Sequence, residues 1–163
     1  MSSTRLGVLL MIFSCLSACA TTNTTTPAPK KVVAAQQKPT LSDTELGRQY
    51  LLGLGVAKDN VKAFYHFKRA ADHGDVFAQN EVAFLYAAGK GIPQDYAIAF
   101  KYYQKAADQG LASAEYNVGF FYLHGLGVEG NRALAKTWIA KAAQSGFEPA
   151  VTLLRTLSAE PSA

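Results

Sequence analysis

Few residues in this sequence have the types and spacing that catalysis or metal binding requires. His66 and His73 are seven residues apart and could share a helix face, but no carboxylate or third histidine completes a metal-binding set. Gly53-Leu54-Gly55 and Gly125-Leu126-Gly127 match only fragments of phosphate-binding loops, and each follows a helical pattern instead of a strand. There is no nucleophile elbow and no HExxH motif. We therefore expect no catalytic residue, no metal site and no cofactor, in a protein that is not an enzyme.

Cys19 is the residue for which the sequence predicts covalent chemistry. It follows a positively charged start at Arg5, the apolar run Leu6–Phe13 and two small residues, an order typical of a secretory signal. The apolar run is too short to span a bilayer as a mature helix. The segment Leu16-Ser17-Ala18-Cys19 resembles the lipobox of bacterial lipoproteins. The resemblance implies a signal peptide over residues 1–18, cleavage before Cys19, and acylation of Cys19 with palmitate-type chains.

The residues around Cys19 also indicate a location. Ala20 follows it, where many lipoproteins retained in the inner membrane have aspartate, so we expect an outer-membrane lipoprotein of the bacterial cell envelope that faces the periplasm. An ordinary signal peptide with a chance cysteine, or an uncleaved anchor, are the alternatives. Cys15 is the only other cysteine and lies in the segment to be removed. The mature chain is therefore expected to hold no disulfide and no thiolate metal site.

Residues 19–40 are expected to be the acylated cysteine and a flexible tether, because residues 20–40 are rich in Thr, Ala, Gln, Pro and Lys and contain no aromatic and no acidic residue. A flexible chain of this length spans on the order of 25 Å. The net charge of +4 arises from Arg5 and three tether lysines, since residues 41–163 carry twelve Lys and Arg and twelve Asp and Glu. A neutral domain does not predict a nucleic-acid partner.

The remainder of the chain repeats one pattern every 36 residues. Glycine, tyrosine and alanine recur in register three times, at Gly53, Gly89 and Gly125, at Gly55, Gly91 and Gly127, at Tyr50, Tyr86 and Tyr122, and at Ala63, Ala99 and Ala135. Self-similarity at such a period is the signature of a solenoid of stacked helical or strand units.

Each repeat is predicted to form two helices, here named helix A and helix B. In the second repeat, apolar positions on one helical face predict helix A over about 79–88, and helix B over about 96–108. The expected N-caps of the three B helices are Asp59, Asp95 and Asn131, and Gly110 is an expected C-cap. Small residues at mid-helix positions, Gly47, Ala83 and Gly119, predict that another helix passes close by.

The repeats resemble a known family. Ala114-x-x-x-Val118-Gly119-x-x-Tyr122-x-x-Gly125-x-Gly127 and Ala135-x-x-Trp138-x-x-Lys141-Ala142-Ala143 are similar to the two halves of the Sel-one-like repeat (SLR), of the tetratricopeptide-like superfamily. The resemblance implies an all-α solenoid over residues 41–158, with three units of 36 residues and a C-terminal capping helix, before a disordered tail at 159–163. It also implies a scaffold for partner proteins. The chain lacks the paired cysteines of some family members.

The candidate partner-binding residues lie on the side of each helix A that is opposite the fixed small positions. They are Arg48, Leu51, Leu52, Phe84, Tyr116, Phe120, Leu123 and His124. In solenoids of the tetratricopeptide type this stripe lines the concave groove, and aromatic residues there are suited to anchor a peptide or partner helix. Tighter packing between helices would also place apolar residues at these positions, and both explanations stay open.

We interpret the chain as a membrane-anchored periplasmic adaptor that binds a partner protein or peptide of the cell envelope through the helix-A stripe. The alternative is a cell-envelope enzyme, or a factor that binds glycan or peptidoglycan, with the repeats as its frame. A carbohydrate site needs exposed aromatic rings beside polar groups, and Tyr116, Phe120 and His124 meet this requirement weakly.

Overall fold

The structure is a computed structural model that describes residues 41–159. The predicted signal peptide, Cys19 and the tether up to residue 40 lie outside the described residues, as do residues 160–163. The described helices belong to one compact unit, Lys38–Ala163.

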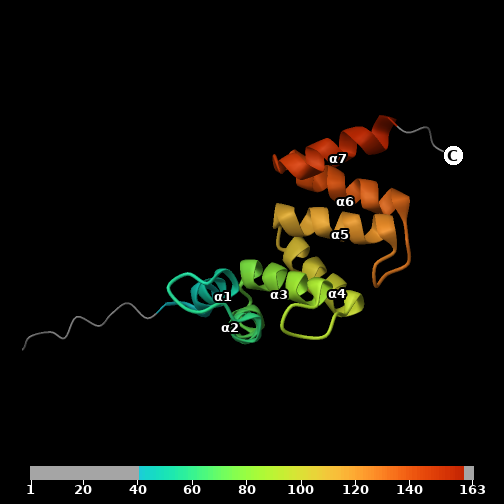
Figure 1. Ribbon diagram of the computed structural model, residues 1–163. Helices are drawn as coiled ribbons and strands as arrows, with labels where there is room; N and C mark the ends of the chain where they lie inside the picture. The colour runs from blue at the N-terminus through green and yellow to red at the C-terminus, as the bar shows by residue number, and fades with distance from the viewer. Residues whose placement is uncertain (1–40, 160–163) are drawn as a thin grey trace, which may run out of the picture. The chain divides into compact units, whose positions relative to one another are not determined.

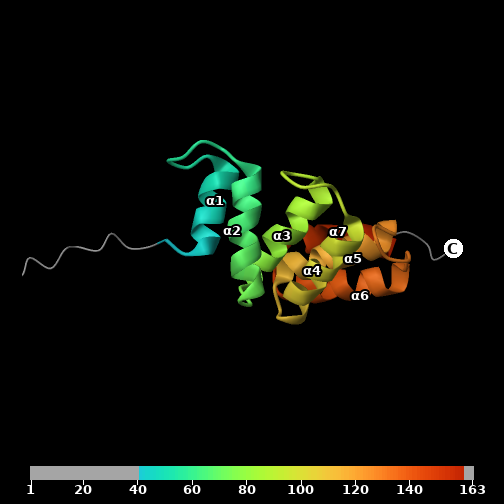
Figure 2. The same cartoon turned by 90° about the horizontal axis from the view of Figure 1, so that it is seen from below.

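Seven α-helices and no strands make up the described residues (Figure 1). They are α1 Asp43–Leu52, α2 Asn60–Asp72, α3 Val76–Ala88, α4 Tyr96–Asp108, α5 Ala112–His124, α6 Arg132–Gln144 and α7 Glu148–Ala159. Each helix packs on the next one in the chain, and Figure 2 shows this for α1 and α2. The A helices are α1, α3, α5 and α7, and the B helices are α2, α4 and α6. The predicted all-α solenoid, six repeat helices and a capping seventh, is confirmed.

Local capping sets where the B helices begin. The side chains of Asp59, Asp95 and Asn131 each accept a hydrogen bond from a backbone N–H of the first turn that follows them, so all three predicted N-caps are confirmed. Helix α3 begins at Val76, three residues before its predicted start, because Asp75 accepts from the backbone N–H of Ala78 at 2.9 Å. The expectation that Gly110 is the C-cap of α4 is wrong by one residue: the C-cap is Gln109, and Gly110 follows it with a positive φ of 86°.

The core consists of three hydrophobic clusters that lie between consecutive helices. The small residues within the A helices allow this packing. A Cβ atom on Gly47 would lie 2.8 Å from the ring of Phe67, and one on Gly119 would lie 2.6 Å from the side chain of Ile139. The predicted close approach of a B helix at these positions is confirmed.

The turn between helices A and B packs on the preceding repeat. Gly91 has a φ of 78°, and a Cβ atom there would lie 2.6 Å from the carbonyl carbon of Asn60 at the start of α2. Gly127 lies in the same way against the backbone of Tyr96 at the start of α4. Gly55, at the same position of the first repeat, has no atom within 4 Å of such a Cβ. The second glycine of the turn is therefore a contact between repeats.

Candidate partner-binding face

The eight predicted partner-binding residues divide into two groups of four by exposure. Half-buried side chains are those of Leu51, Phe84, Tyr116 and Leu123, and exposed ones are those of Arg48, Leu52, Phe120 and His124. None of the eight is fully buried. We call these eight residues the helix-A face.

Three aromatic side chains form a continuous row along α5. The ring centroids of Tyr116 and Phe120 are 6.4 Å apart, and those of Phe120 and His124 are 4.3 Å apart. Phe120 keeps 36% of its surface exposed although its ring contacts two others. Rings one helical turn apart support one another in this way, so the row presents an ordered apolar surface to solvent.

A hollow lies beside this row, between α5 and α7. Its volume is about 570 Å³, and its walls are Tyr116, Glu148, Pro149, Thr152, Leu153 and Thr156. The size is in the range of sites that take a few side chains or a small ligand. Sequence analysis missed the α7 residues, although Thr152 and Thr156 stand 36 residues after Tyr116 and Phe120. Extending the repeat period into the capping helix would have found them.

A series of polar contacts extends from Arg48 of the helix-A face across α1, α3 and α5. Arg48 forms an ion pair with Glu45 at 3.2 Å. Burial raises the pKa of Glu81 above its ordinary value, while a hydrogen bond from Asn80 and the charge of Arg48 oppose this shift. The amide of Asn117 on α5 donates to the side-chain oxygen of Asn80 at 3.4 Å. Sequence analysis missed this group, although Glu45, Glu81 and Asn117 share one position of the repeat.

The half-buried members of the face also contribute to the core. Leu51 and Phe84 pack against the cluster between α2 and α3, and Tyr116 and Leu123 pack against the cluster between α6 and α7. Interhelix packing therefore explains why these four positions are apolar. The ring of Phe84 lies under the ammonium of Lys90, at 4.6 Å, and makes no ring contact with Phe120 among the described aromatic pairs.

The two histidines considered for metal binding have structural contacts. The Nδ1 atom of His66 lies 2.9 Å from a carboxylate oxygen of Asp43, and its ring stacks on Tyr50 at 5.6 Å. The Nδ1 atom of His73 lies 2.7 Å from the carbonyl oxygen of Arg69. Among residues 41–159, no three side chains of His, Cys, Asp or Glu gather where a metal ion could bind. Within the same residues, no helix has the length and apolar character needed to cross a bilayer.

Comparison with known proteins gives a match to a repeat family. The family model of the Sel1 repeat matches residues 42–75, 76–111 and 112–147. Among curated proteins, none matches the sequence of this chain.

Three solved structures are similar. A Sel1 repeat protein from Oxalobacter formigenes is 38% identical, with a TM-score of 0.64, over 70% of this chain and 86% of that one. A protective antigen of uropathogenic Escherichia coli with an SLR fold is 27% identical, with a TM-score of 0.65, over 69% of this chain and 24% of that one. Cysteine-rich protein B of Helicobacter pylori is 24% identical, with a TM-score of 0.59, over 68% of this chain and 86% of that one. The last likeness shows the fold alone.

Proposed function

The chain belongs to the Sel1 repeat family, whose repeats generally mediate protein–protein interaction, and we propose that it is a lipid-anchored adaptor of the bacterial periplasm. In this proposal, Cys19 carries the lipid at the outer membrane, and the helix-A face holds a partner protein or peptide. Proteins of this family are typically scaffolds without enzymatic activity, and the proposal includes no catalytic step.

The main observation in support of partner binding is the α5 aromatic row beside the hollow. Phe120 is exposed over 36% of its surface, and the hollow of about 570 Å³ begins at Tyr116, one turn away. An exposed aromatic residue next to a hollow that can take a partner side chain is the usual arrangement at the centre of a protein interface. A partner helix or extended peptide on this face would cover Phe120 and place one side chain in the hollow.

Phe120→Ser is the variant that tests partner binding. The partner is first captured by crosslinking in intact envelopes, with the acylated protein, and is then titrated with the purified chains. Removing a central aromatic anchor costs about 2 kcal/mol or more of binding, so the affinity should fall by at least about thirtyfold. The free energy of unfolding should fall by only about 1 kcal/mol, because the ring is partly exposed in the free chain.

Phe121→Ser is the matched control, because Phe121 is adjacent and only 5% exposed. Its loss should appear as instability of about 3–5 kcal/mol. If Phe120→Ser destabilises the chain to the same degree and leaves binding by the folded fraction unchanged, the helix-A face is not the binding surface. Binding of purified peptidoglycan by the wild-type chain, lost with Tyr116→Ala, would support the glycan-binding alternative, which the Tyr116 ring beside Glu148 and Thr152 favours.

Cys19→Ala tests the lipid anchor. The variant should carry no lipid and should accumulate as the uncleaved precursor or leave the membrane, because the thiol that receives the acyl chain is missing. Cell fractionation with a salt wash and mass spectrometry of the N-terminus measure both results. Cys15→Ala should behave as wild type. A cleaved Cys19→Ala protein that stays with the outer membrane through the wash would contradict the anchor.

A further inference from the structure

Charged residues are unevenly divided between the two kinds of helix. The B helices contain eight Lys and Arg and two Asp, which gives a net charge of +6. The A helices contain five Asp and Glu and two Arg, which gives −3. The neutral total of the folded residues therefore hides an excess of positive charge on the B helices.

The exposed side of the B helices is mostly basic, and its two acidic residues, Asp72 and Asp108, are the last residues of α2 and α4. The exposed positions at steps of four along the three helices are Val61, Tyr65 and Arg69, then Ala97, Lys101 and Lys105, then Ala133, Thr137 and Lys141. We call these nine residues the B-helix stripe. A period of 36 residues relates the three sets, so the solenoid repeats the same outward surface three times.

Two cations of the B-helix stripe have carboxylate partners and two do not. Arg69 lies 3.0 Å from Asp43, and Lys141 lies 2.9 Å from Glu115. Lys101 and Lys105 form no ion pair within residues 41–159, and the ammonium of Lys105 lies over the ring of Tyr102 at 5.2 Å. Two adjacent turns of α4 therefore present to solvent two positive charges that form no ion pair.

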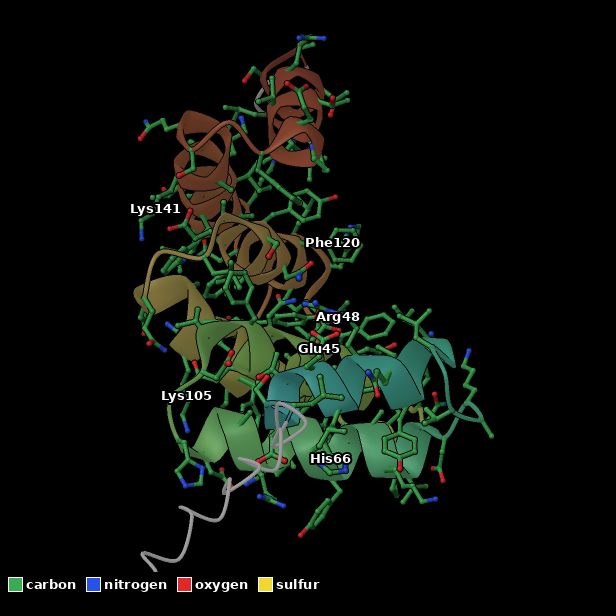
Figure 3. All side chains as sticks on the ribbon, turned by 90° about the vertical axis from the view of Figure 1, so that its left-hand side faces the viewer. Glu45, Arg48, His66, Lys105, Phe120 and Lys141 are labelled. Carbon is green, nitrogen blue, oxygen red and sulfur yellow. The ribbon has the colours of Figure 1, made fainter. Side chains whose placement is uncertain are left out.

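The cations of the stripe on α4 and α6 lie away from the α5 aromatic row. Figure 3 shows Lys105 and Lys141 on one side of the helical unit and Phe120 on the other. A ligand on the stripe and a partner on the helix-A face would therefore not compete for the same side chains.

We infer that the B-helix stripe binds the anionic phospholipid headgroups of the bilayer that holds the lipid anchor, so that the helix-A face is turned toward the periplasm. The orientation rests on the proposed anchor at Cys19. Each Lys or Arg near an anionic surface contributes an affinity factor of about five. This attraction acts over roughly 10 Å, and the predicted tether would keep the domain within a few such lengths of the membrane.

Apolar side chains within the stripe favour a bilayer over a soluble polyanion. Val61 is 60% exposed and Tyr65 is 57% exposed, both on α2. A membrane interface takes up valine and tyrosine side chains next to cations, because the apolar part enters the acyl boundary while the charge stays at the headgroups. Duplex DNA, which binds cations through its phosphates, has no apolar layer that could take up these two side chains.

The experiment uses the mature chain with Cys19→Ser, which cannot be acylated. The vesicles are phosphatidylcholine with or without about 30% phosphatidylglycerol, an anionic lipid. Flotation at low and high salt gives the partition coefficient. Lys101→Glu/Lys105→Glu should lower the partition coefficient on anionic vesicles by at least about 25-fold. The matched control is Lys90→Glu/Arg155→Glu, which changes the net charge equally at exposed positions outside the stripe and should lower it less than about threefold.

Several results would overturn the inference. Equal binding to vesicles with and without phosphatidylglycerol, or equal losses in the two charge variants, would show that the stripe is not a headgroup site. Equal affinity for DNA and anionic vesicles, unchanged by Val61→Ser/Tyr65→Ser, would show a general polyanion site. If the glutamate variant loses helicity, Lys101→Gln/Lys105→Gln repeats the test. Partner capture should be unaffected by Lys101→Glu/Lys105→Glu, so failure of the stripe is distinct from failure of the helix-A face. Because the chain used for flotation is unacylated, its binding to vesicles does not depend on the anchor.

Discussion

At the scale of single residues, a polar side chain near the start of α1, α3 and α5 meets the following B helix or the turn after it. Asp43, Gln79 and Glu115 are 36 residues apart. Asp43 pairs with Arg69 at 3.0 Å, Gln79 accepts from Gln109 at 2.8 Å, and Glu115 pairs with Lys141 at 2.9 Å. A buried polar group is costly without a partner, so these contacts fix which surfaces of the two helices meet.

Glu81 gives a pH-dependent prediction. Burial raises its pKa above the ordinary 4.5, so the folded chain holds this proton more tightly than the unfolded chain. Folding therefore takes up a proton between the two pKa values, and the stability contribution falls as the pH rises from about 4.5 through the folded pKa. Glu81→Gln should melt at a higher temperature than wild type at about pH 7.5. The difference in melting temperature should narrow at about pH 4.5, where the wild-type carboxyl is protonated more often. Melts at the two pH values measure this.

Glu45→Gln is the control for Glu81→Gln. It removes a carboxylate at the same repeat position, but Glu45 is paired with Arg48 and has 41% of its side chain exposed. We expect no gain of stability at neutral pH from this change. If both variants melt at a higher temperature than wild type, the gain in stability comes from the change in net charge and not from the burial of Glu81.

At the scale of the elements, the A–B turn connects each repeat to the one before it. Gly91 and Gly127 lie against the first residue of α2 and of α4, where a Cβ atom would overlap the backbone. The turn is therefore part of the interface between repeats as well as a connection within one. The same turn of the first repeat is open at Gly55, and Leu54 is 51% exposed beside it.

Gly91→Ala and Gly55→Ala form a matched pair that tests this contact. Both glycines have a similar positive φ, 78° and 73°, so each alanine costs about 1–2 kcal/mol for the left-handed backbone. Gly91→Ala also meets the backbone of Asn60 at 2.6 Å, which should add about 1–3 kcal/mol. Urea unfolding of both variants measures the difference. Equal losses would mean that the turn does not stabilise the interface between repeats.

At the scale of the whole helical unit, each helix packs mainly on its neighbours in sequence. Stability in such an array is approximately a sum of repeat and nearest-neighbour contributions. Helix α7 covers the last B helix, where Ile139 and Ala142 are fully buried, and contributes Ala150 and Leu157 to the same cluster. The capping helix therefore buries the apolar surface of the third repeat, as the third repeat buries that of the second.

Leu157→Ala tests the capping function of α7. Leu157 is 4% exposed, so its truncation should cost about 2–5 kcal/mol. Hydrogen exchange should quicken first in α6 and α7 and leave α2 and α3 protected, because the effect passes only between neighbouring helices. The exposed Arg155→Ala in the same helix should change stability by less than about 0.5 kcal/mol. Uniform loss of protection in all seven helices would contradict a nearest-neighbour array.

The helices of this fold and their order can be predicted from local sequence features. The period of 36 residues gave the number of helix pairs, and Asp59, Asp95 and Asn131 gave the starts of the B helices. The small residues at Gly47 and Gly119 gave the points of closest helix approach. These features depend on local backbone chemistry and on a spacing that can be counted, so they did not require knowledge of the distant contacts.

The depth at which each side chain is buried, and the place of the hollow on the surface, depend on the packing of distant helices. Tyr86, one of the tyrosines that recur every 36 residues, is only half-buried. Half of the helix-A face also packs into the core clusters, and the hollow beside Tyr116 exists because α7 lies opposite α5. Burial depends on how the repeats rotate relative to one another. The repeat pattern in the sequence does not give this rotation angle. The angle is set by contacts between side chains that are far apart in the sequence.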